Sequence, residues 1–287
     1  MAGFFGLFNY EKEGPGISKN APKKKTFIVF FETFFRNFWK FIPINLVYSL
    51  CSLPLITNGL ASAGYTNVAR NTARDKHSFG LSDYFDTIKK NWKQALGAGI
   101  INVLVVVVLI FDFMTFWPME GWFGLIGRGI SMCIAFIFLI MNFYIWTLII
   151  TFNFKLSQIY RNSFKFVFLN MKMNLLCGVV LLLCYACGAG LFILGFKWPI
   201  VFALLFIISI CCFAGFRFLL IQYCTFPAIR KYIIDPYYAE HPDDDIELRR
   251  NLGLEIPGED DEEDEDENEE NSEENEEEDP DAPIFED

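Results

Sequence analysis

Long apolar runs recur along the chain, and short polar or charged breaks separate them. A helix of about 18 or more apolar residues is long enough to cross a bilayer. The pattern predicts six membrane segments, at about 27–52, 53–69, 95–117, 123–153, 173–196 and 198–226. The breaks WPMEGW and GFKWP join the last four segments in pairs, so the six segments form three helical hairpins. The predicted fold class is therefore all-α, a polytopic transmembrane helical bundle.

A separate amphipathic stretch, LSDYFDTIKKNWKQ, lies at 81–94. Tyr84, Phe85, Ile88 and Trp92 share one face of a helix at this spacing, and Ser82 is suited to cap its start. Aromatic residues on one face and lysines on the other are typical of a helix that lies in the membrane surface. We therefore expect an interfacial helix at 81–94.

Charge divides the chain into a basic body and an acidic tail. Residues 243–287 contain 25 Asp and Glu but 2 Arg, whereas residues 1–242 contain 22 Lys and Arg and 10 Asp and Glu. A tail with so many charges cannot form a buried hydrophobic core, so we expect residues 236–287 to be disordered. Its role is open between a solvating tail, a segment that binds the body's own basic face, and a docking strip for a basic partner or Ca²⁺. Residues 26–235 form the predicted membrane domain, and residues 1–25 form a cytoplasmic arm.

The segment at 53–69 decides the topology. If it were a loop, five segments would span, and the basic link at 70–93 would lie across the membrane from the basic arm. Positive residues favour the cytoplasmic side, so the six-segment arrangement, with both termini cytoplasmic, agrees better with the charges. Gly59, Ala63 and Asn67 lie on one row of this segment with Ser62 beside them, which predicts close packing on a neighbouring helix.

The stretches SLPLITNGLASAGYTNVARNTARD and SDYFDTIKKNWKQAL resemble the YesL family of bacterial integral membrane proteins. The resemblance covers roughly residues 1–100 and is only hydropathic afterwards. It implies an accessory membrane protein, often associated with carbohydrate uptake and degradation in Gram-positive bacteria. The long acidic tail departs from the compact pattern of that family.

Polar residues inside the apolar segments are the candidate functional positions. Arg217 lies in FAGFRFLLIQYC, and an intramembrane charge marks either a functional site or a side chain that snorkels or forms an ion pair. Glu32 is a possible partner for Arg217, but Arg36 lies four residues after Glu32 and competes for it. Asn45, Asn102 and Asn142 are suited to hydrogen bonds between helices.

Signals of enzymes and cofactors are weak. Cys184 and Cys187 form a CxxC motif without a nearby histidine, and the two histidines, His77 and His241, belong to no recognisable motif. Because no acid–base pair is evident, we expect neither an enzyme nor a bound metal or cofactor. Basic loops of a membrane protein report orientation and anionic lipid, so we expect the bilayer and no nucleic acid as partner.

The sequence thus predicts a multi-pass cell-membrane protein that serves as an accessory or regulatory component, with sugar-transporter subunits as candidate partners. The alternative is a small solute transporter in its own right. The sequence does not predict an oligomeric state.

The six-segment topology can be tested with a reporter fused after His77. We expect this reporter to be cytoplasmic, because the basic link then lies on the same side as the basic arm. An extracellular reading at this position would contradict the topology.

Overall fold

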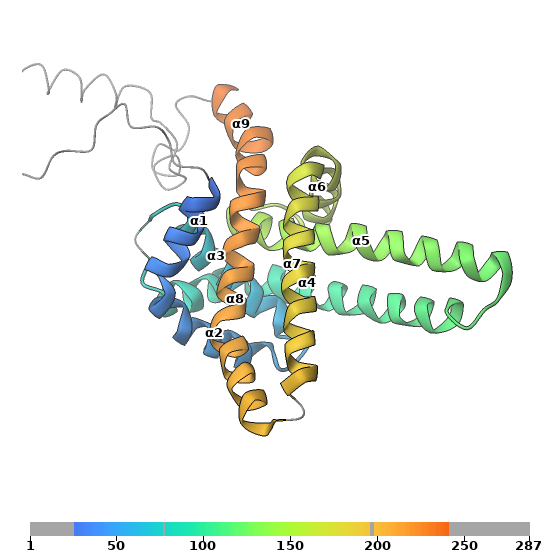
Figure 1. Ribbon diagram of the computed structural model, residues 1–287. Coiled ribbons are helices and arrows are strands. Elements are labelled where there is room, and N and C mark those ends of the chain that lie inside the picture. Colours follow the sequence, from blue (N-terminus) through green and yellow to red (C-terminus); the bar gives the residue numbers. More distant parts are fainter. Residues whose placement is uncertain (1–25, 77, 196–197, 241–287) are drawn as a thin grey trace, which may run out of the picture.

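The computed structural model describes residues 26–76, 78–195 and 198–240, and every regular element in these ranges is a helix (Figure 1). The predicted all-α fold class is confirmed. The predicted arm at 1–25 and the tail from residue 241 lie outside the described residues. The elements are α1 (Thr26–Arg36), α2 (Phe38–Ser52), α3 (Asn58–Ala73), α4 (Leu81–Phe116), α5 (Gly121–Thr151), α6 (Leu156–Leu169), α7 (Met171–Gly195), α8 (Pro199–Ile229), the π-helix η1 (Arg230–Ile234) and α9 (Asp235–Glu240).

Among the described residues, four helices are long and apolar enough to cross a membrane, which indicates a membrane-embedded protein. They are α4, α5, α7 and α8, and they correspond to the last four predicted segments. The first two predicted segments are also helical but form shorter elements. Residues 27–52 divide at Asn37 into α1 and α2, and most of 53–69 lies in the 16-residue helix α3. Whether these segments cross the bilayer stays a prediction.

Helix boundaries differ from the expectations at three places. The stretch predicted as a separate interfacial helix, 81–94, runs without a break into the next segment, so α4 is 36 residues long. Nothing in KQALGA ends a helix, because glycine inside a long helix weakens it without breaking it. The link between the last two hairpins contains a 14-residue amphipathic helix, α6. Finally, α8 continues through Pro227 and the π-turn η1 follows directly, where backbone hydrogen bonding shifts register.

Helix α3 is the hub of the arrangement. It packs against α2, α4, α5 and α8, and ten of its sixteen residues are buried. Two long hairpins leave this hub in different directions. Figure 1 shows α4 and α5 extending sideways, crosswise to the hairpin of α7 and α8.

Glycine allows the close contact between α3 and α4. A Cβ atom placed on Gly59 would lie 2.8 Å from the Cα of Gly99, and one placed on Gly99 would lie 3.2 Å from the Cα of Gly59. Real Cβ atoms do not approach backbone so closely, so the two helices meet backbone to backbone. The close packing predicted for the small-residue row of 53–69 is therefore confirmed.

This contact predicts a specific sensitivity to a single methyl group. Gly59→Ala should lower the free energy of unfolding by about 1–3 kcal/mol, because α3 and α4 must move apart. Gly97→Ala is the matched control, since a Cβ there meets only the flexible Leu156 side chain at 3.4 Å. Thermal unfolding of the two variants in the same detergent makes the comparison. Equal midpoints for both variants would contradict the close contact.

Candidate functional site

A cavity of about 650 Å³ lies where the two hairpins leave the hub, and α3, α4, α5, α7 and α8 all line it. Most of its lining is apolar. Its polar side chains are those of Asn58, Ser62, Asn102, Asn142, Tyr185 and Arg217. The fold therefore brings Arg217, Asn102 and Asn142, from three helices, to the same cavity. A largely apolar hollow with a few convergent polar groups is the usual form of a small-molecule site.

Arg217 is held by aromatic side chains. Its Nη2 donates a hydrogen bond to the Tyr48 hydroxyl at 2.8 Å, and its guanidinium lies 4.5 Å from the centre of the Phe218 ring. The Nε atom is buried and has no hydrogen-bond partner among the residues that the structure describes. Tyr48, on α2, is thus the partner of Arg217, in place of the suggested Glu32. Sequence reasoning missed Tyr48, because an intramembrane arginine directs the search toward carboxylates.

Asn102 and Asn142, which also line the cavity, belong to a hydrogen-bonded relay across three helices. Asn102 on α4 donates to Asn142 on α5 at 2.7 Å, and Asn142 donates to the Phe138 carbonyl at 2.9 Å. Tyr160 on α6 donates to Asn102 at 2.8 Å. The expected hydrogen bonding between helices is present for both asparagines. Tyr160 lies outside the predicted membrane segments, so sequence reasoning missed it.

Asn45 lies on α2 and is not among the residues that line the cavity. It is fully buried, accepts a hydrogen bond from the Tyr65 hydroxyl at 2.5 Å and donates one to the Cys211 carbonyl. This residue therefore joins α2, α3 and α8 through side-chain hydrogen bonds. Its position is a packing position of the kind expected for a buried polar group.

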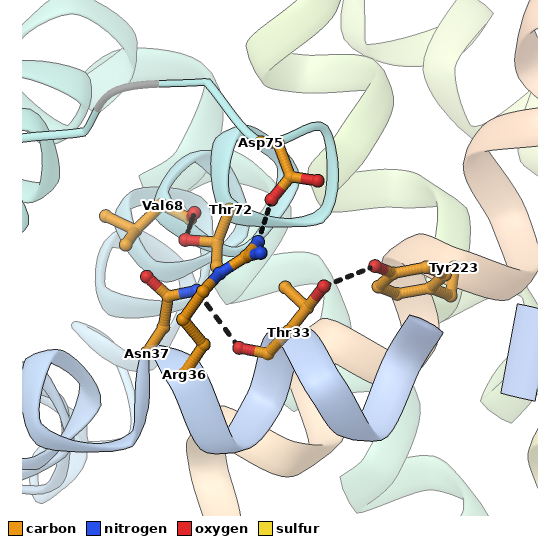
Figure 2. Close-up of polar contacts among 7 residues, drawn as sticks. All are labelled: Thr33, Arg36, Asn37, Val68, Thr72, Asp75 and Tyr223. Atoms are coloured by element: carbon orange, nitrogen blue, oxygen red, sulfur yellow. Dashed lines mark hydrogen bonds and ion pairs between the residues drawn. The ribbon is translucent and has the colours of Figure 1, made fainter. Parts of the chain in front are cut away.

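The remaining predicted residues, Glu32 and Arg36, lie on α1, away from the cavity lining, and both are exposed. Arg36 forms an ion pair with Asp75, just beyond the end of α3 (Figure 2). The expected competition of Arg36 for Glu32 is replaced by this contact between two elements. Beside it, the Tyr223 hydroxyl donates to Thr33 at 3.1 Å, which ties α1 to α8 (Figure 2).

Residues that bind metal ions do not gather in the described part of the chain, which contains no group of three or more His, Cys, Asp or Glu side chains with suitable spacing. The eight cysteines are free thiols, and Cys184 and Cys187 are both on α7. Among the described residues that line the cavity, Arg217 is the single charged one, and none is a carboxylate. Chemically, the site offers one cation and several amide and hydroxyl groups.

Residues 41–113 match a family model that is described as a protein of unknown function, DUF624. The matched region runs from α2 through most of α4, so it contains the whole of the hub helix α3. It overlaps the residues that carry the resemblance to the YesL family, but it covers less than half of the chain. The comparison with curated proteins and that with solved structures give no match. Together with the apolar helices, this match indicates a membrane protein of unestablished activity.

The relay predicts measurable coupling between two asparagines. In a double-mutant cycle of Asn102→Ala and Asn142→Ala, we expect a coupling energy of about 0.6–1.7 kcal/mol, the range found for hydrogen bonds between membrane helices. The control cycle pairs Asn142→Ala with Asn45→Ala, which belongs to a different network and should be additive. The free energy of unfolding of each variant is measured in mixed micelles. Additivity in both cycles would contradict the relay.

Proposed function

We propose that the protein is an accessory or regulatory component of the cell membrane, associated with a carbohydrate-uptake system. The observation that carries this proposal is the hairpin of α4 and α5, whose outer half stands clear of the other helices (Figure 1). Its exposed side chains are large and apolar, among them Val108, Phe111, Met114, Trp122 and Phe123. Such a face suits a second membrane protein as well as lipid.

The cavity supports the same proposal. Transporters that couple a solute to protons or cations commonly place carboxylates along the path. The described part of the lining has one cation, Arg217, and no carboxylate. The chemistry favours a protein that binds its partners over one that drives solutes across the membrane. The association with carbohydrate uptake rests on the YesL resemblance alone.

Co-purification from native membranes tests the proposal. The protein is tagged at its N-terminus, and a photo-crosslinking amino acid is placed at Val108. The matched control places it at Ile207 on α8, a position of similar exposure. We expect sugar-transporter subunits at near-equal amounts, with protein crosslinks from position 108 and mainly lipid adducts from 207. Recovery of the protein alone, with lipid adducts at both positions, would contradict the proposal.

A small solute transporter is the second candidate, because Arg217, Asn102 and Asn142 share one cavity. For a transporter, the purified chain in liposomes should move a sugar without any other protein, and Arg217→Gln should reduce this flux. Arg128→Gln is a control that removes a charge outside the cavity lining. Flux no faster than in empty liposomes would remove this candidate.

A further inference from the structure

A group of cations gathers where the C-terminal end of α3 meets the end of α8. We call Arg70, Arg74, Lys76 and Arg230 the basic cluster. Arg70 donates to Thr151 at 2.7 Å and to Asn67 at 2.9 Å, and the Arg74 guanidinium lies 4.6 Å from the centre of the Phe226 ring. Arg230, in η1, and Lys76 are close enough to interact electrostatically with Arg74. The cluster thus joins two elements far apart in the sequence.

Arg70 and Arg74 of the basic cluster have no acidic partner among the described residues. The adjacent Asp75 is bound by Arg36 from α1, as Figure 2 shows, and Asp235 is bound by Arg230 at 3.2 Å. Arg70 Nε and Arg74 Nη2 are buried and have no hydrogen-bond partner in the described part of the chain. A buried donor without a partner is costly, and a buried cation without an anion more so.

The pKa values of Arg74 and Lys76 are lowered, which is consistent with this arrangement. Burial, and secondly the nearby Arg230, lower the pKa of Arg74 to about 10. Burial, followed by Arg74 and Arg70, also lowers the pKa of Lys76. Both shifts arise from burial and from neighbouring cations, and an anion bound beside them would raise both pKa values.

We infer that the basic cluster binds the chain's own acidic tail, through the stretch at 259–279. This stretch contains 17 Asp and Glu among 21 residues and no Lys or Arg. Carboxylates are among the groups with which arginine forms its strongest, charge-assisted hydrogen bonds. Charge complementarity therefore fits the cluster and the stretch to each other, and the contact is separate from the proposed role of the hairpins.

The point of attachment places the acidic stretch within reach. The described chain ends at Glu240 on α9, ten residues after Arg230, or about 15 Å along a helix. The acidic stretch begins 19 residues later, and 19 residues of chain can span at most roughly 65 Å, so the stretch can reach the cluster. A tethered ligand that can reach its site has an effective concentration of up to order millimolar. The tail therefore has an advantage over any free anion.

Zero-length crosslinking of the full-length protein tests this inference. A water-soluble carbodiimide joins a carboxylate to a lysine amine when the two are in contact, and mass spectrometry locates the new amide bonds. We expect glutamates of 259–279 to be crosslinked to Lys76. The yield at Lys76 should exceed the yield at Lys90 and Lys93, which are exposed on α4. At about 0.5 M NaCl, where the screening length falls to roughly 4 Å, the yield at Lys76 should drop several-fold.

Two charge variants distinguish binding of the acidic tail at the basic cluster from unspecific attraction to any basic surface. Arg74→Gln with Arg230→Gln keeps Lys76 as the reporter and should lower its crosslink yield several-fold. Lys90→Gln with Lys93→Gln removes the same charge elsewhere and should leave the yield unchanged. Both variants are compared at equal helix content and equal elution volume. If the Arg variant does not fold, the inference is tested on the unmodified protein. The two criteria are the preference for Lys76 over Lys90 and Lys93 and the fall in yield at high salt.

Four results would overturn the inference. Even crosslinking of Lys76, Lys90 and Lys93 would show unspecific attraction, and an unchanged yield in the Arg variant would exclude the cluster. Crosslinks between isotopically labelled and unlabelled copies would assign the contact to a second molecule. Loss of the Lys76 crosslinks in phosphatidylglycerol nanodiscs, but not in neutral ones, would assign the cluster to lipid phosphate.

Discussion

The rest of the structure depends on the backbone contact between α3 and α4. Helix α3 is made of small and polar residues, NGLASAGYTNVARNTA, so it gains little from facing lipid and must be enclosed by other helices. Gly59 and Gly99 allow α4 to approach at backbone distance, and α2, α5 and α8 cover the other sides. The matched region of the DUF624 model, 41–113, includes both partners of this contact. The part of the chain that contains this backbone contact is therefore also the part that matches the family model.

Side-chain hydrogen bonds then fix the other helices to the hub. Asn45 and Tyr65 tie α2 to α3, and Tyr48 ties α2 to Arg217 on α8. In hydrocarbon an unsatisfied polar group is expensive, so these pairs select one arrangement of the helices. The outer halves of the hairpins present large apolar side chains outward. They are the part of the molecule suited to lipid and to other membrane proteins.

The sequence predicted those features that arise from local pattern. The fold class, the last four apolar helices and the small-residue row at Gly59 follow from hydropathy and spacing. The division at Asn37, the continuous α4 and the helix α6 were missed, because aromatic interfacial residues look alike in a short helix and in the start of a long one. The partners of Arg217 and Arg36 could not be predicted, because Tyr48 and Asp75 are brought to them only by the packing of α2, α3 and α8. Likewise, the charges of the basic cluster are visible in the sequence, but their convergence is not.

The central claim is that the α3 hub directs the two hairpins apart. Pulsed electron–electron double resonance tests this directly, because it measures the distance between spin labels placed at Met119 and Ile200, near the two hairpin tips. Each arm extends about 15 residues beyond the hub, or roughly 22 Å, so crosswise arms place the tips roughly 30 Å apart or more. Arms packed side by side, with axes about 10 Å apart, would give labels within roughly 20 Å. The first result agrees with a hub that orients separate arms, and the second would contradict it.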